Sequence, residues 1–273
     1  MKRIDAHIHL QKSNPHFDQL AQQAGHENSE KHLRETFAKE GIVRAIVMSH
    51  LRMEADGINY PQDLFSYCAG VGHDALDADK IANSIETAER LLRLDQCAGL
   101  KIYAGYTRYD LDDPVYIPFY ELAQKYEKPV AVHMGTTAHA RAILRYAHPL
   151  QMDKVAVDFP DVQFVMCHYG NPWLMDAAAV VEKNNNVAAD LSGLIAGNFD
   201  VEYYLRDQHG YVEQLRTWIH YVENYDKFMF GTDWPLTNFG NYIKLFERII
   251  PEEHREKFFY LNAKRIYGLP EGV

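Results

Sequence analysis

The chain has 273 residues, of which 47% are apolar and 24% charged, a balance typical of a globular protein with a sizeable core. Its formal net charge is −10 without any basic run. This argues against nucleic acid and anionic membrane as partners, because neutralising phosphates requires clustered Lys and Arg. The three cysteines lie apart without a CxxC motif and predict buried thiols in a reducing compartment. Since neither a secretory signal nor a membrane-spanning apolar stretch is evident, we expect a cytoplasmic protein.

Short apolar runs alternate along the chain with stretches of helical periodicity. The apolar runs predict eight strands, at 4–10, 41–48, 65–71, 99–103, 129–134, 162–168, 187–191 and 227–233. The intervening segments predict helices at 16–39, 79–95, 114–126, 138–147, 151–159, 172–183 and 212–223, with two or three more before residue 268. Pro114 is expected in the first turn of its helix, where a missing N–H costs nothing.

Alternation of this kind implies parallel strands joined by crossover helices. Eight such units in 273 residues predict a single-domain (β/α)8 TIM barrel over residues 1–273. A doubly wound open sheet is the competing fold. Its nucleotide-binding signature, GxGxxG after the first strand, is absent here, and this favours the barrel.

Polar side chains gather at the C-terminal ends of the predicted strands. His7 and His9 end the first run, and residues i and i+2 of a strand share a face, so both imidazoles can reach one ion. The other strand-end polar residues are Lys101, His133, His168 and Asp233. Each also has an ordinary interpretation, as a core histidine, a turn residue or an ion-pair partner. Their joint occurrence at one barrel end favours a shared site.

Four short motifs give the chain a resemblance to a known family. They are His7-Ile8-His9, His133-Met134-Gly135, the segment 168–173 (HYGNPW) and the segment 231–235 (GTDWP). Together with the C-terminal segment 262–269 they resemble the amidohydrolase superfamily. The narrower resemblance is to the amidohydrolase-related branch of metal-dependent hydrolases that includes aminocarboxymuconate semialdehyde decarboxylase.

This resemblance implies one divalent metal ion held by His7, His9, His133 and Asp233. Zn²⁺ is the expected ion, with Mn²⁺, Fe²⁺ or Co²⁺ able to replace it. The resemblance further implies that Asp233 takes a proton from metal-activated water, and that His168 stabilises charge on the substrate or donates a proton. In two-metal relatives a carboxylated lysine stands where Lys101 does, and His168 is then also a ligand. One metal is favoured here.

Three functions remain open at this point. Hydrolysis of an amide, ester or lactone of a small organic acid is favoured, and metal-dependent decarboxylation of an aromatic or unsaturated acid is the alternative. The third is a barrel that binds metal or ligand without turnover. Phosphoester hydrolysis is a minor further option, since the acidic charge disfavours DNA. Tyr103 and Trp173 are the candidate substrate contacts, and a homodimer is left open because relatives often pair.

Overall fold

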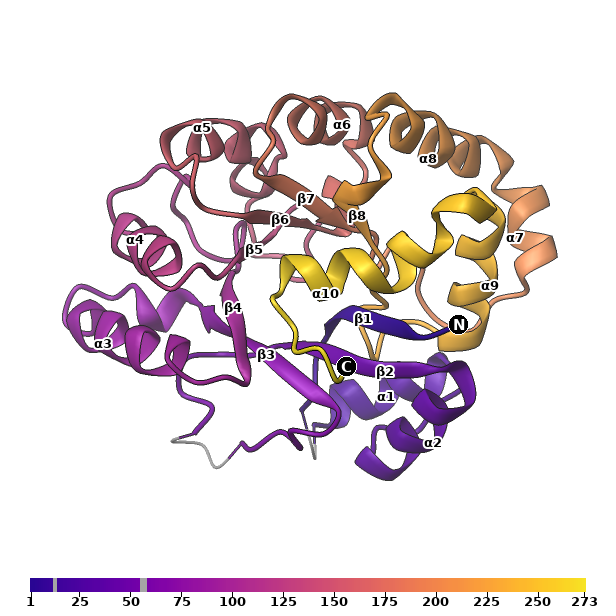
Figure 1. Ribbon diagram of the computed structural model, residues 1–273, viewed down its shortest axis with the longest axis horizontal. Helices are drawn as coiled ribbons and strands as arrows, with labels where there is room; N and C mark the ends of the chain where they lie inside the picture. Colours follow the sequence, from indigo (N-terminus) through magenta and orange to yellow (C-terminus); the bar gives the residue numbers. More distant parts are fainter. Residues whose placement is uncertain (12–13, 55–57) are drawn as a thin grey trace.

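The computed structural model describes residues 1–11, 14–54 and 58–273. Within these ranges eight parallel strands pair in chain order around a barrel (Figure 1). They are β1 (Arg3–Ile8), β2 (Ile42–Met48), β3 (Phe65–Val71), β4 (Cys97–Ile102), β5 (Val130–His133), β6 (Phe164–Cys167), β7 (Val187–Asp190) and β8 (Phe228–Met229). Backbone bonds from Ala6 N to Phe230 O (2.9 Å) and from Asp233 N to His7 O (2.8 Å) close the sheet. The predicted (β/α)8 barrel is confirmed, since an open sheet lacks such closure.

Helices surround the barrel, and the C-terminal helix lies across the ring of strands, where its residues pack on the interior cluster (Figure 1). They are α1 (Pro15–Gln23), α2 (Glu30–Glu40), α3 (Ile81–Leu92), α4 (Ile117–Lys125), α5 (Leu150–Asp158), α6 (Leu174–Lys183), α7 (Val201–Asp207), α8 (His209–Tyr221), α9 (Phe239–Ile249) and α10 (Asn262–Ile266). Within the described ranges, no helix combines the length and the apolar character that crossing a bilayer requires. All three cysteines are buried free thiols, as predicted.

Three predicted helix boundaries are wrong, each for a local reason. The segment 16–39 forms two helices, because Ser29 accepts a hydrogen bond from His32 N and caps a new helix. The predicted start at Pro114 is displaced to Ile117, because Pro118 takes the first-turn position that suits a proline. Of the segment 138–147, only Leu144–Ala147 forms a short 3-10 turn.

The barrel interior is a packed apolar core. Its buried residues include Ile4, Ile46, Cys68, Val165 and Met229 from five different strands. The C-terminal segment packs into the same cluster through Ala263, Ile266, Tyr267, Leu269 and Val273. Because the interior is filled, chemistry is confined to the mouth at the C-terminal ends of the strands.

Gly70, in β3, shows how closely the loop after β2 approaches the barrel mouth. A Cβ atom at this position would lie 1.9 Å from Ser49 O and 2.9 Å from Cε2 of Tyr103. We expect Gly70→Ala to lower the free energy of unfolding by about 3 kcal/mol, because backbone must move to admit the methyl group. Chemical denaturation measures this loss. Gly72→Ala is the matched control, since a Cβ there meets nothing within 4 Å. Equal stability of the two variants would contradict the prediction.

Candidate metal centre

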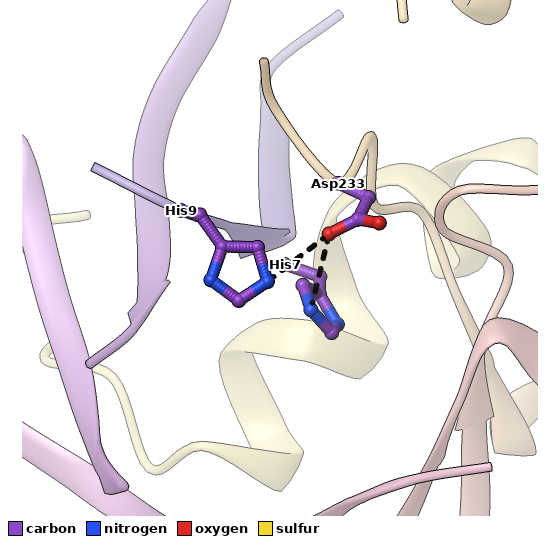
Figure 2. Close-up of side chains that lie close together, drawn as sticks. All are labelled: His7, His9 and Asp233. Atoms are coloured by element: carbon purple, nitrogen blue, oxygen red, sulfur yellow. Dashed lines mark ion pairs between the residues drawn. The ribbon is translucent and has the colours of Figure 1, made fainter. Parts of the chain in front are cut away.

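Side chains from the two ends of the chain meet where β1 and β8 adjoin (Figure 2). Asp233 Oδ1 lies 3.5 Å from His7 Nε2 and 3.3 Å from His9 Nε2. These three residues offer ligand atoms that all lie within 4.8 Å of one another. The Asp233 backbone has a φ of +60°, a conformation that costs a non-glycine residue about 1–3 kcal/mol and that gathers at functional sites. The predicted convergence of these three side chains is therefore present.

The far nitrogens of both histidines are bound to oxygen atoms that can only accept. His7 Nδ1 lies 3.0 Å from Asp190 Oδ2, and His9 Nδ1 lies 3.1 Å from Met48 O. Each ring, when it holds a single proton, therefore carries that proton on Nδ1 and turns the lone pair of Nε2 towards Asp233. His7 Nε2 and Asp233 Oδ1 are both buried without a hydrogen-bond partner in the described chain. The Nε2 atoms of the two histidines and Asp233 Oδ1 are all acceptors, and no proton lies between them. A cation bound among them would satisfy these buried atoms.

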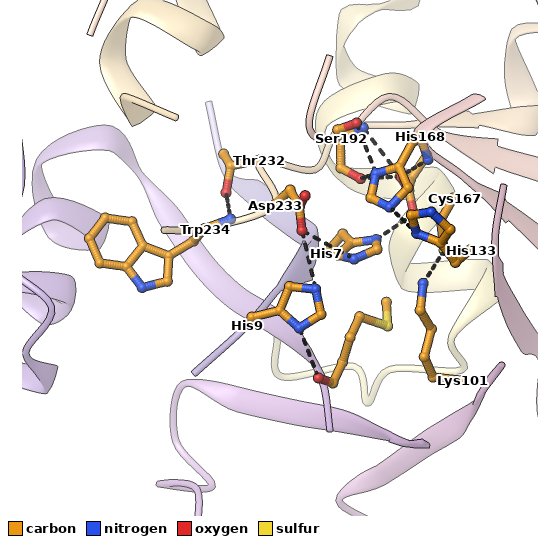
Figure 3. A network of polar contacts seen from close by, with 12 residues as sticks. His7, His9, Lys101, His133, Cys167, His168, Ser192, Thr232, Asp233 and Trp234 are labelled. Carbon is orange, nitrogen blue, oxygen red and sulfur yellow. Dashed lines mark hydrogen bonds and ion pairs between the residues drawn. The ribbon is translucent and has the colours of Figure 1, made fainter. Parts of the chain in front are cut away.

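His133 and His168 form a second pair beside the first (Figure 3). His133 Nδ1 lies 3.1 Å from His168 Nε2, and the His168 ring centroid lies 4.7 Å from that of His7. The far nitrogens again meet carbonyl oxygens, with His133 Nε2 3.0 Å from Thr136 O and His168 Nδ1 3.1 Å from Ser192 O. Two lone pairs thus face each other, as in the first pair. His133 lies outside the group that shares 4.8 Å spacing.

Burial controls the charges of this cluster. It lowers the pKa of His7 to about 3, and the charge of Lys101 acts in the same direction. Burial likewise lowers the pKa of His133 well below its ordinary value and lowers the pKa of His168. Burial acts to raise the pKa of Asp233, but contacts with the neighbouring histidines outweigh it and hold that pKa well below the usual range. At neutral pH, therefore, these three imidazoles are uncharged and Asp233 is ionised.

Two buried carboxylates at this end of the barrel were not predicted from the sequence. Asp190 ends β7 and binds His7, and a single acidic residue inside the apolar run 187–191 was the signal for it. Asp5 accepts hydrogen bonds from Thr232 Oγ1 (2.6 Å) and His7 N (3.1 Å). Asp5 therefore ties the ends of β1 and β8 together, and burial raises its pKa to about 7.

The remaining predicted site residues differ in their distance from the cluster. Lys101 is fully buried, with Nζ 2.9 Å from Cys167 Sγ and 5.6 Å from the centre of the Tyr103 ring. The Tyr103 hydroxyl lies 2.9 Å from Ser49 O, so Tyr103 braces the loop after β2. Trp173 packs against His148, with ring centroids 4.8 Å apart. The structure thus brings Lys101 and Tyr103 to the mouth and pairs Trp173 with His148.

Comparison with known proteins identifies the family. The sequence profile of the family described as Amidohydrolase matches residues 4–269. No curated protein matches the chain.

Several solved structures share the fold at low sequence identity. One is 2,6-dihydroxybenzoate decarboxylase from Rhizobium, with 17% identity, a TM-score of 0.67, and coverage of 98% of this chain and 99% of that chain. A second is 5-carboxyvanillate decarboxylase from Novosphingobium aromaticivorans, complexed with manganese and a nitrobenzoic acid. It has 13% identity and a TM-score of 0.66, and the match covers 98% of this chain and 96% of that chain. A third is a probable 2-pyrone-4,6-dicarboxylic acid hydrolase from Acinetobacter baumannii. It has 14% identity and a TM-score of 0.62, and the match covers 98% of this chain and 100% of that chain. The profile match, on a barrel with histidines and an aspartate at its mouth, shows that this chain belongs to the amidohydrolase family of the amidohydrolase superfamily.

Proposed function

We propose that this protein is a metal-dependent enzyme that hydrolyses an amide, ester or lactone of a small organic acid. One observation carries the proposal: acceptor atoms of His7, His9 and Asp233 converge, and two of those atoms are buried without a hydrogen-bond partner among the described residues. His133 Nδ1, which lies outside this group and next to His168, is the proposed fourth ligand atom. Three imidazoles and one carboxylate suit Zn²⁺, with Mn²⁺, Fe²⁺ or Co²⁺ as substitutes.

Two residues would carry the proton transfers of hydrolysis. A bound metal ion supplies a Lewis acid and lowers the pKa of water that it holds. Asp233 is ionised, and its side chain is 17% exposed, so it can take a proton from water at the mouth. His168 holds its own proton on Nδ1, against Ser192 O, so Nε2 would accept the proton that Asp233 took from water and pass it to the leaving group.

The surroundings of Lys101 favour an anionic substrate. Its buried ammonium group lies against the Cys167 thiol, and burial raises the pKa of that thiol, so the thiol is neutral. Among the described residues no carboxylate forms an ion pair with Lys101, and a buried cation of this kind attracts an anion. The carboxylate of a small organic acid would meet this need, and the Tyr103 ring would form a wall next to it. Trp173, packed on His148, is a further proposed substrate contact.

Decarboxylation of an aromatic or unsaturated carboxylic acid is the second candidate. Two of the solved structures that share this fold are decarboxylases of aromatic acids, and one of them is complexed with manganese. The same metal ligands would serve, and His168 or Asp233 would place a proton on carbon instead of taking one from water. Both candidates involve a small carboxylic acid, which is the substrate of decarboxylation and a product of hydrolysis.

Metal analysis and product analysis test both candidates on one preparation. Protein loaded with Zn²⁺ or Mn²⁺ and dialysed is expected to retain one equivalent of metal. A panel of lactones, esters, amides and aromatic acids is then followed by proton release, by amine release and by carbon dioxide release. We expect proton release with lactones or esters, or amine release with amides. Carbon dioxide from an aromatic acid would overturn hydrolysis in favour of decarboxylation. Two equivalents of metal would overturn the one-metal site. Inactivity of the metal-loaded protein on the whole panel would overturn both reactions and favour a barrel that binds metal or ligand without turnover.

A further inference from the structure

We infer that Asp190 is a positioning residue, one that holds His7 in the tautomer that binds metal and aligns His168 beside it. This inference rests on the proposed function for the roles of the two histidines. Asp190 lies at the end of β7 and is completely buried. Its two oxygens face four polar groups: His7 Nδ1, His168 N, Ser192 N and Ser192 Oγ.

One oxygen of Asp190 sets the proton of His7. Asp190 Oδ2 lies 3.0 Å from His7 Nδ1, and both side chains are shielded from solvent. An ionised carboxylate only accepts hydrogen bonds, so His7 must carry its single proton on Nδ1. Nε2 is then bare, and it is the His7 atom that faces Asp233 without a partner. Second-layer carboxylates of this kind orient metal-binding histidines in many metalloproteins.

The other oxygen of Asp190 holds His168. Asp190 Oδ1 accepts hydrogen bonds from His168 N (2.9 Å), from Ser192 N (3.2 Å) and from Ser192 Oγ (2.5 Å). Ser192 Oγ in turn lies 2.9 Å from His168 Nδ1 (Figure 3). A single carboxylate therefore connects a proposed metal ligand on β1 with a proposed proton-transfer residue at the end of β6.

A serine nucleophile is excluded by the order of these contacts. In a catalytic triad the carboxylate binds the histidine, and the histidine takes the serine proton. Here the Ser192 hydroxyl donates to Asp190, and His168 Nδ1 donates to the Ser192 carbonyl, so that nitrogen has no free lone pair for the hydroxyl proton. Ser192 is also completely buried. The three side chains serve to position one another.

Asp190→Asn tests the inference with almost no change in shape. The three donors at Oδ1 keep the amide oxygen on their side, so the amide NH2 group faces His7 Nδ1. Because the NH2 group only donates, the proton of His7 must move to Nε2 and block the metal-binding atom. Nitrogen NMR spectra of metal-free protein labelled with 15N-histidine are expected to show His7 protonated on Nδ1 in the wild type and on Nε2 in the variant. Calorimetry is expected to show Zn²⁺ binding about 10–100-fold weaker.

Ser192→Ala is the matched control, because it removes a donor to the same carboxylate but leaves its bond to His7. We expect the His7 tautomer of the wild type in this variant. Wild-type protein with His7 protonated on Nε2 would overturn the inference, even if Asp190→Asn failed to fold. Unchanged His7 signals and Zn²⁺ affinity in Asp190→Asn would also overturn it. The spectra need neither metal nor substrate, so they test the role of Asp190 even if the proposed reaction fails.

Discussion

Asp233→Asn is expected to bind Zn²⁺ at least about 100-fold more weakly than the wild type. Loss of a residue that only hydrogen-bonds a metal ligand weakens metal binding by about 10–100-fold, and loss of a ligand is expected to cost more. The variant keeps the size of the side chain but removes the negative charge that His7 Nε2 and His9 Nε2 face at 3.5 and 3.3 Å. It also removes the proposed proton acceptor. Turnover by protein saturated with metal is therefore expected to fall by roughly 10³-fold. Calorimetric titration with Zn²⁺ and steady-state assays measure the two losses separately.

Asp112→Asn is the control for this experiment, since Asp112 is exposed and pairs with Lys154, 3.7 Å away, which is not one of the residues of the cluster. Its metal affinity and turnover are expected to match the wild type. An Asp233→Asn variant that binds Zn²⁺ as tightly as the wild type would remove Asp233 from the metal centre. If Asp233→Asn kept its Zn²⁺ affinity but lost turnover, Asp233 would have a role in proton transfer alone.

His168→Ala is expected to keep its metal ion and to lose most of its turnover. In the one-metal arrangement His168 faces His133 Nδ1 at 3.1 Å and serves the substrate, so removing its ring leaves the ligands in place. Loss of a general acid or base costs roughly 10²–10⁴-fold in rate. Elemental analysis after dialysis gives the metal content, and initial rates at saturating substrate give kcat.

His209→Ala controls for the loss of a histidine, because the His209 side chain is 71% exposed. It is expected to retain full metal content and rate. If His168→Ala lost metal in proportion to activity, His168 would be a ligand and the two-metal arrangement would gain support. An unchanged kcat with metal retained would defeat its role in proton transfer.

Local patterns were sufficient to predict the barrel. A strand buried on both faces reads as a continuous apolar run, and β3 and β6 both have that form. Helix boundaries were less well determined, because a cap or a proline a few residues away decides where a helix starts. Pro118 moved the start of α4, and Ser29 divided the predicted helix 16–39. These competing local signals have similar free energies, so pattern alone does not rank them.

The sequence by itself determined most of the side chains that reach the mouth, although not Asp5 and Asp190, because a strand end is a local property that an apolar run reveals. His7, His9, His133, His168 and Asp233 were all predicted in this way. Only the tertiary structure decided which of their nitrogen atoms face inwards. That choice depends on hydrogen bonds between residues far apart in the chain, such as His7 with Asp190 and His9 with Met48 O. A neutral imidazole can carry its proton on either ring nitrogen, so its tautomer depends on where the fold places a hydrogen-bond acceptor.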